Sequence, residues 1–267
     1  MAARILFSHA NSFPAGTYRV LFESLRQRGF EVHAVEQFGH DPQYPVTNNW
    51  PHLVQQLADF ARQWQQDGAP AFLVGHSLGG ILSLMCAARH PELARGVLLL
   101  DSPILGGWKA TTLGLVKRTA LVGSLSPGRV SQKRRNHWAS EAAALDNFRH
   151  KKAFAHWDPQ VLADYVACGT HDRDGQRWLS FDRDVETAIY NSLPDNLAGL
   201  LKRHPLKCPA AFIGATHSVE MRQVGMDLTR HVTKGRVMML DGSHLFPMEK
   251  PLATAAAIEA SLRNLGS

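Results

Sequence analysis

Short apolar runs alternate with longer helical stretches in the amino-terminal part of the chain, and this alternation constrains the fold most strongly. The stretches between the runs repeat their apolar residues at helical spacing. The expected strands are residues 4–8, 31–35, 71–75 and 96–100, and the expected helices are residues 18–28, 53–65 and 78–89. Such a β-α-β-α order predicts an α/β fold with a doubly wound, mostly parallel sheet and helices on both faces.

The same rhythm returns near the end of the chain, with expected strands at 210–214 and 236–240 and a helix at about 251–265. The sheet is therefore expected to have about six strands. Residues 104–205 break the rhythm, because they are rich in helix formers, tryptophans and basic residues. We predict a core of residues 1–103 and 206–267 and a mainly helical cap insertion of residues 104–205. Within it, Asp174-Gly175 predicts one small hairpin.

Composition places the chain among globular proteins that need neither disulfides nor a membrane. It has 267 residues, of which 45% are hydrophobic, enough for one large core. Its three cysteines, Cys86, Cys168 and Cys208, lie far apart, which suggests neither a disulfide framework nor a zinc site. No targeting peptide is apparent, and no apolar run approaches the ~20 residues that span a bilayer. We therefore expect a cytoplasmic protein without a membrane partner.

The formal net charge is +6, and basic residues concentrate between Arg129 and Lys152. Basic charge can bind nucleic acid, but here no interleaved aromatic platform or known nucleic-acid module accompanies it. We interpret the basic stretch as a solvated helical face and expect no nucleic-acid partner. The oligomeric state does not follow from the sequence.

The sequence Gly-His-Ser-Leu-Gly at residues 75–79 matches the pattern G-x-S-x-G. It follows an apolar strand and opens a helix, as a nucleophilic serine on a sharp strand-to-helix turn requires. Glycine removes the Cβ clashes of such a turn. These features predict that Ser77 is a nucleophile at the carboxyl end of a central strand. The alternative is that Ser77 only caps the helix, but capping requires neither the flanking glycines nor Gly80.

A serine hydroxyl needs a neighbouring base, and histidine has a suitable pKa near neutrality. Among 14 histidines, His244 follows directly after the last expected strand, in a loop that should face the same sheet edge as Ser77. The third member should be a carboxylate at another strand end. Asp101 ends the strand after the nucleophile helix, and Glu220 follows the strand 210–214. We favour Asp101 as the acid and keep Glu220 as the alternative.

Acyl transfer also needs two donors for the transition-state oxygen, one of them the backbone N–H after the nucleophile. This assigns Leu78. The second donor should come from the loop after the first strand, where Asn11 is the candidate, with a plain turn residue as the alternative. The residues expected to line the substrate pocket are His9, Phe13, His76, Trp108 and Phe246.

Taken together, these motifs resemble the α/β-hydrolase superfamily over nearly the whole chain. The resemblance implies a serine hydrolase in which Ser77, Asp101 and His244 form the triad and residues 104–205 form the cap over the active site. An acid after this strand resembles the arrangement in haloalkane dehalogenases, although those enzymes have an aspartate where this chain has Ser77. His9-Ala10 departs from the family's usual His-Gly pair, which puts the shape of the oxyanion loop in question.

The resemblance implies cleavage of an ester or thioester of a hydrophobic small molecule, through an acyl-enzyme and with no metal or cofactor. Carbon–carbon bond hydrolases and cofactor-free haloperoxidases share the same triad and remain alternatives. A non-catalytic ligand-binding protein on the same fold is the third possibility, although a receptor has no need of a complete triad. The natural substrate does not follow from the fold.

Overall fold

The computed structural model describes residues 2–65, 68–106 and 128–266, which build a six-stranded sheet in the order β2-β1-β3-β4-β8-β9. All five neighbouring pairs are parallel. The strands are β1 (Ala3–Ser8), β2 (Phe30–Ala34), β3 (Ala71–His76), β4 (Ala94–Leu100), β8 (Ala210–Ala215) and β9 (Val237–Leu240). The predicted α/β class and the count of six strands are confirmed.

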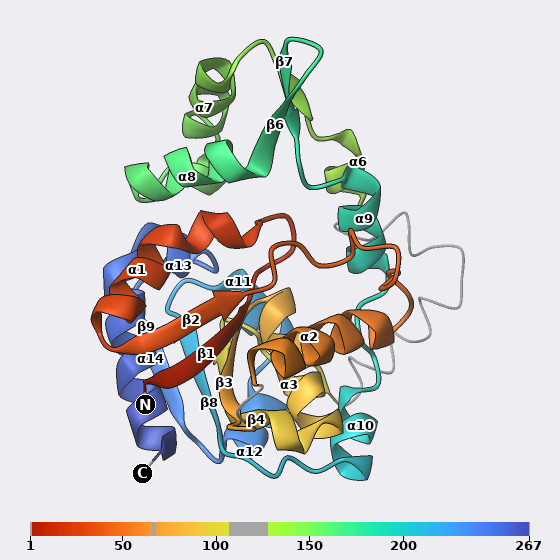
Figure 1. Ribbon diagram of the computed structural model, residues 1–267, viewed down its shortest axis with the longest axis vertical. Helices are drawn as coiled ribbons and strands as arrows, with labels where there is room; N and C mark the ends of the chain where they lie inside the picture. Colours follow the sequence, from red (N-terminus) through yellow and green to blue (C-terminus); the bar gives the residue numbers. More distant parts are fainter. Residues whose placement is uncertain (1, 66–67, 107–127, 267) are drawn as a thin grey trace.

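Helices cover both faces of this sheet (Figure 1). Alternate side chains of each strand point to opposite faces, so Ile5 and Phe7 pack on one side and Leu6 on the other. One face carries α1 (Arg19–Gln27) and α14 (Pro251–Gly266), and the other carries α2 (Pro51–Trp64), α3 (Leu78–Arg89) and α10 (Leu197–Arg203). Because both faces are covered, the central strands β3 and β4 are mainly apolar.

Short elements follow the last strands and connect the layers. They are α11 (Val219–Val224), α12 (Asp227–Thr233) and α13 (Phe246–Glu249). The 3₁₀ segments lie elsewhere: Ala15–Tyr18 after β1, Pro91–Leu93 before β4, and Lys152–Phe154 between residues 128 and 191. The loops before α11 and α13 leave the carboxyl ends of β8 and β9. Since parallel strands end at one edge, these loops meet there.

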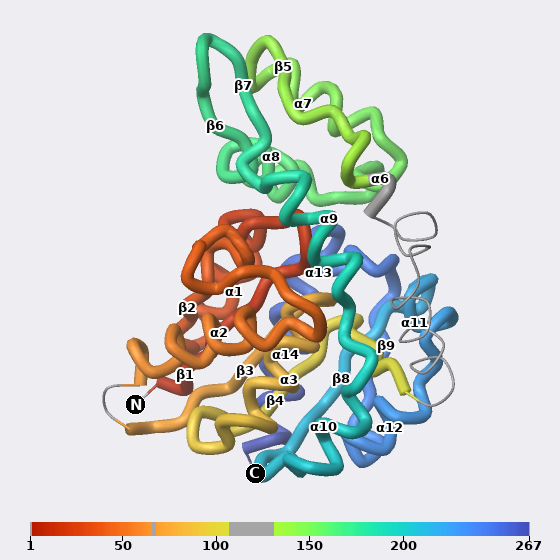
Figure 2. The backbone as a smooth tube through the Cα atoms, turned by 90° about the vertical axis from the view of Figure 1, so that its right-hand side faces the viewer, coloured from red at the N-terminus to blue at the C-terminus, as the bar shows by residue number. Residues whose placement is uncertain are grey.

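The elements between residues 128 and 191 form a separate layer over this edge, here called the upper unit (Figures 1 and 2). Its elements are α6 (Gly128–Lys133), β5 (His137–Trp138), α7 (Glu141–Arg149), α8 (Pro159–Gly169), β6 (Thr170–Arg173), β7 (Gln176–Leu179) and α9 (Arg183–Asn191). The predicted Asp-Gly hairpin is confirmed, because Asp174 and Gly175 turn with φ of 52° and 73° between antiparallel strands. Helix α10 lies within the range 104–205 that was predicted as the cap, but it packs against α3 of the core.

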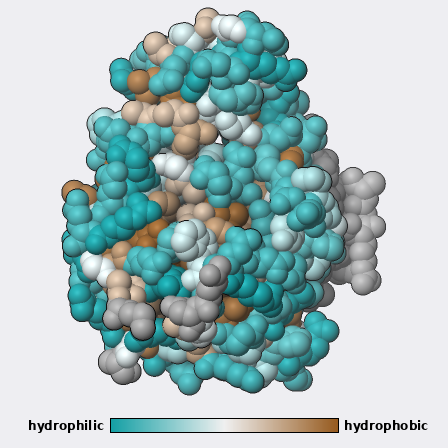
Figure 3. All heavy atoms as spheres, viewed as in Figure 1, coloured by the Kyte–Doolittle hydropathy of each residue, from teal (hydrophilic) through white to brown (hydrophobic). Residues whose placement is uncertain are grey.

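The face shown in Figure 3 is largely hydrophilic, and its apolar residues show in patches that extend from the upper unit to the middle of the layer below it. No helix in the described part of the chain is both long enough and apolar enough to cross a membrane. The apolar material therefore lies chiefly in the two helix layers that sandwich the sheet and within the upper unit.

Candidate active site

Ser77 occupies a sharp turn between β3 and α3. Its φ is 53° and its ψ is −115°, a conformation that L-residues rarely adopt. Ser77 stands at the N-cap position of α3, but its side chain makes no capping hydrogen bond. The capping interpretation therefore does not hold, and Ser77 Oγ bonds to another partner, described below.

The surrounding glycines are required by close packing. A Cβ on Gly75 would lie 2.2 Å from the backbone of Gly79, and a Cβ on Gly79 would lie 1.9 Å from the carbonyl oxygen of Ser8. Both distances are far below van der Waals contact. The backbone of α3 thus approaches the end of β1 closely, which places the loop after β1 beside Ser77.

His244 lies between Ser77 and Asp101. Its Nε2 is 3.0 Å from Ser77 Oγ, and its Nδ1 is 2.6 Å from Asp101 Oδ2. The three residues come from the ends of β3, β4 and the loop after β9, which all meet at the carboxyl edge of the sheet. The imidazole is thus held with one nitrogen toward the hydroxyl and the other toward a carboxylate, as general-base chemistry at a serine requires.

Asp101 is fully buried, and each of its carboxylate oxygens accepts hydrogen bonds. Oδ1 accepts from the Ala215 N–H at 2.9 Å, and Oδ2 accepts from the Ser218 hydroxyl at 2.6 Å as well as from His244. These bonds compensate for the loss of hydration of a buried charge. The carboxylate of Asp101 is therefore held by Ala215, Ser218 and His244, all of them remote in the chain.

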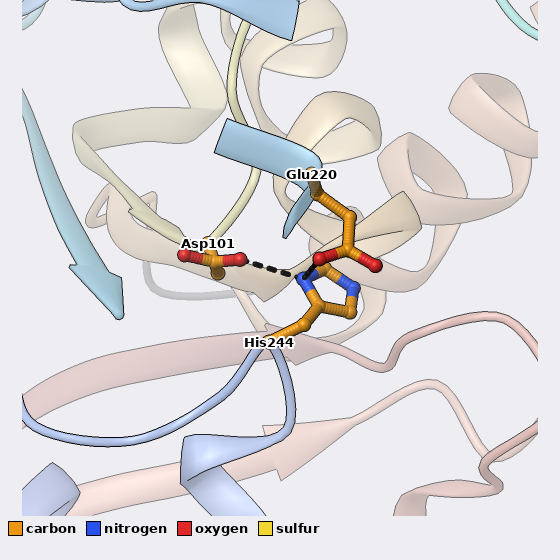
Figure 4. Close-up of side chains that lie close together, drawn as sticks. All are labelled: Asp101, Glu220 and His244. Carbon is orange, nitrogen blue, oxygen red and sulfur yellow. Dashed lines mark hydrogen bonds and ion pairs between the residues drawn. The ribbon is translucent and has the colours of Figure 1, made fainter. Parts of the chain in front are cut away.

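Glu220 lies on the open side of the same imidazole (Figure 4). Its Oε2 is 3.7 Å from His244 Nδ1, and its side chain is 45% exposed. Asp101 is both closer and fully buried, so the geometry favours it over Glu220 as the orienting acid. Asp101, Glu220 and His244 each offer an atom that could bind a metal ion, and these atoms lie within 4.8 Å of one another. A metal is not needed to explain the position of the Asp101 carboxylate, because Ser218 and Ala215 already hold it through hydrogen bonds.

The loop after β1 carries the second expected oxyanion donor. It forms a turn in which the Phe13 N–H donates to the Ala10 carbonyl at 3.2 Å, and Ser12 has a φ of 78°. Asn11 lies in the wall of the same cavity as Ser77. Leu78 is the first residue of α3, where helix N–H groups have no intrahelical partner. Both predicted donors therefore come from segments next to Ser77.

Helix α9 of the upper unit holds this loop through Glu186. The Asn11 side-chain amide donates to the Glu186 carbonyl at 3.1 Å, and the Ser12 hydroxyl donates to the Glu186 carboxylate. Glu186 is buried and forms an ion pair with Arg134 at 2.9 Å. The upper unit thus contributes to the shape of the loop after β1.

A cavity of about 510 Å³ opens onto Ser77 and His244. Its volume suits a small-molecule ligand. The core and the upper unit both supply the walls, which include Ala10, Asn11, Phe13, Lys152, Ala153, Ala155, His156, Tyr190, His217, Val219, Glu220, Ser243, Leu245 and Glu249. The wall combines apolar side chains, such as Phe13 and Leu245, with charged ones, such as Lys152 and Glu249.

Of the predicted pocket residues that the structure describes, only some line this cavity. Phe13 lines the cavity, whereas His9, His76 and Phe246 are 0% exposed and lie behind the wall. Each is enclosed by segments remote in the chain: the Phe38 N–H, for example, donates to His9 Nε2 at 2.9 Å. Trp108 lies outside the described residues.

Tyr190 is a cavity residue that the sequence analysis missed. It lies on α9, and burial raises the pKa of its phenol to about 12, so the hydroxyl stays protonated at neutral pH. No local signal in the sequence marks it, because it reaches the cavity only through the packing of α9 on the loop after β1.

His9 and His76 make the stability of the fold sensitive to acid. Burial lowers the pKa of His9 to about 4 and that of His76 to about 3, against 6.5 in an exposed histidine. Below about pH 6.5 both histidines take up protons in the unfolded chain but stay neutral in the folded one. The free energy of unfolding is therefore highest above that pH and falls as the pH drops toward 4.

We expect the free energy of unfolding in urea to be lower at pH 5 than at pH 7.5, by on the order of 2 kcal/mol for each of these histidines. The measurement is a urea titration at both pH values, followed by circular dichroism. Equal unfolding free energies at the two pH values would contradict the exclusion of protons from these side chains.

Comparison with known proteins gives a family and several distant relatives. The alpha/beta hydrolase family matches residues 5–257. A monoglyceride lipase homolog of Monkeypox virus is 26% identical over 176 residues, which cover 60% of this chain and 62% of the relative. The monoglyceride lipase of Rattus norvegicus is 29% identical over 130 residues, which cover 47% of this chain and 43% of the relative. The aligned parts span less than two thirds of these relatives.

Among solved structures, E-2-(acetamidomethylene)succinate hydrolase is similar to this chain with a TM-score of 0.73. The similarity covers 98% of this chain and 92% of that chain, at 21% identity. At this identity the likeness supports the shared fold and carries no information on the substrate.

Proposed function

Because this chain belongs to the alpha/beta hydrolase family, we propose that it is a serine hydrolase that cleaves a carboxylic ester or thioester of a hydrophobic small molecule. The observation that carries the proposal is the 3.0 Å separation between Ser77 Oγ and His244 Nε2, with Asp101 behind the imidazole. The two relatives described above, a monoglyceride lipase and a monoglyceride lipase homolog, are compatible with an ester substrate.

In the proposed cycle, Ser77 Oγ attacks the acyl carbonyl while His244 Nε2 takes the hydroxyl proton. The N–H groups of Leu78 and Asn11 bind the oxyanion, and each such donor typically contributes ~3 kcal/mol of transition-state stabilisation. His244 then passes the proton to the leaving alcohol or thiol. Water, activated by the same imidazole, hydrolyses the acyl-enzyme and releases the acid.

The walls of the cavity support a hydrophobic acyl group. Phe13, Val219 and Leu245 line it, together with Ala153 and Ala155 of the upper unit. In this proposal the upper unit acts as the cap. The shape of the cavity then depends on how the upper unit is seated on the core.

The test is turnover of p-nitrophenyl esters of increasing acyl length. Burying one methylene is worth ~0.8 kcal/mol, so kcat/KM is expected to rise roughly tenfold from acetate to butyrate. A fluorophosphonate probe should label the wild-type protein in parallel.

A β-diketone assayed beside the esters separates the proposal from its rivals. Cleavage of the diketone without ester turnover would replace the proposal by carbon–carbon bond hydrolysis. Absence of both labelling and turnover would favour a non-catalytic ligand-binding protein.

A further inference from the structure

His76 precedes the nucleophile, but its side chain points away from the cavity into the protein. It is 0% exposed, and both ring nitrogens have a partner. Nε2 lies 2.8 Å from the backbone carbonyl oxygen of His244, and Nδ1 lies 2.8 Å from the hydroxyl of Tyr18. The proposed mechanism uses neither nitrogen.

The proton positions follow from the chemistry of the partners. A carbonyl oxygen can only accept, so Nε2 of His76 must carry the hydrogen that it donates to His244. Nδ1 is then unprotonated and accepts from the Tyr18 hydroxyl. The Tyr18 oxygen in turn accepts from the Ala10 N–H at 3.1 Å. One continuous chain of hydrogen bonds therefore runs from Ala10 to His244.

The two ends of this hydrogen-bond network lie in the two loops that the proposed reaction needs. Ala10 directly precedes Asn11 in the oxyanion loop, and His244 carries the base. The link passes through His76, the residue before the nucleophile. Burial keeps the imidazole of His76 neutral, because its pKa is lowered to about 3, and therefore the hydrogen-bond pattern does not change at neutral pH.

From this network we infer that His76 and Tyr18 are positioning residues. They fix the loop after β1, which carries Asn11, and the loop after β9, which carries His244, in position relative to Ser77. The inference rests on the proposed function, since it assigns these residues to the same site. Neither residue touches the substrate. Each acts through a backbone group: the N–H of Ala10 or the carbonyl of His244.

Aromatic packing around this network permits a nearly isosteric test. The Tyr18 ring lies 4.8 Å from Phe7 and 6.0 Å from Phe22, between ring centroids. Tyr18→Phe keeps this packing and removes only the hydroxyl. It leaves the Ala10 N–H and the His76 Nδ1 without their partner.

We expect Tyr18→Phe to lower kcat for p-nitrophenyl butyrate about tenfold, with KM within about twofold of wild type and labelling by the fluorophosphonate slowed in parallel. His76→Leu, which breaks the network at both ends, should lower kcat by roughly a hundredfold. His76→Gln can still donate to the His244 carbonyl and should recover part of that loss.

Tyr44→Phe serves as the matched control, because Tyr44 donates to Asp59 at 3.1 Å, a hydrogen bond that involves no residue of this network. Its kcat should equal that of wild type. Circular dichroism and thermal unfolding of all variants show whether each is folded at the assay temperature.

A folded Tyr18→Phe with kcat within twofold of wild type would overturn the inference. Equal losses in kcat for His76→Gln and His76→Leu would overturn the assignment of the His244 contact. Both results presuppose that the wild type turns over esters and that Ser77→Ala does not. If that condition fails, the proposed function is wrong independently of Tyr18 and His76.

Discussion

Ser77→Ala is expected to lower turnover of p-nitrophenyl esters by roughly a thousandfold or more, since it removes the atom that forms the acyl-enzyme. His244 Nε2 would lose its hydroxyl partner at 3.0 Å. The fold should persist, because the hydrogen bond that anchors this turn runs from the Ser77 N–H to the Leu100 carbonyl at 3.0 Å, through the backbone alone. Fluorophosphonate labelling should disappear together with turnover.

Ser83→Ala provides the matched control on the same helix. Ser83 is 0% exposed, and its hydroxyl has no hydrogen-bond partner among the described residues. Its removal should leave kcat/KM unchanged and should not lower the unfolding temperature. If Ser77→Ala turned over esters as fast as the wild type, Ser77 would not be the nucleophile.

Asp101→Asn should have the second largest effect, a loss in kcat of about a thousandfold or more. The new side-chain amide would present an N–H group toward His244 Nδ1 and would favour the tautomer that cannot accept the serine proton. The buried carboxylate would also disappear from a position 2.6 Å from the imidazole, so the imidazolium formed during the reaction would lose its stabilisation.

Glu220→Gln makes the same chemical change at the competing carboxylate. Glu220 lies 3.7 Å from Nδ1 and is 45% exposed, and solvent-exposed ion pairs contribute little. Its kcat should therefore stay within about threefold of wild type. Measured kcat values in the reverse order would identify Glu220 as the orienting acid.

The backbone architecture follows closely from local patterns. Alternating apolar runs and helical stretches predict the six parallel strands because the inner runs, such as β3 and β8, must be buried on both faces. The glycines around Ser77 mark the turn between β3 and α3 for the same local reason, since a Cβ on Gly79 would collide with Ser8. His244 could be singled out because it directly follows the last strand.

The side chains of the pocket did not follow from the sequence. His9 and His76 flank candidate site residues in the chain, yet partners as distant as Phe38 and Tyr18 draw both imidazoles inward. Tyr190 reaches the cavity from α9, which is more than 100 residues from Ser77 along the chain. Sequence proximity to the nucleophile is therefore a poor guide to contact with the substrate.

The sequence by itself determined the order of strands and helices, the strained turn at Ser77 and the loop that carries His244, because these depend on short-range backbone geometry and on which faces are apolar. Only the tertiary structure showed that Asp101 lies closer to His244 and is more deeply buried than Glu220, and only it brought Tyr18, His76 and His244 into one hydrogen-bond network. Such choices depend on contacts between segments far apart in the chain, where a shift of about one ångström separates a hydrogen bond from none.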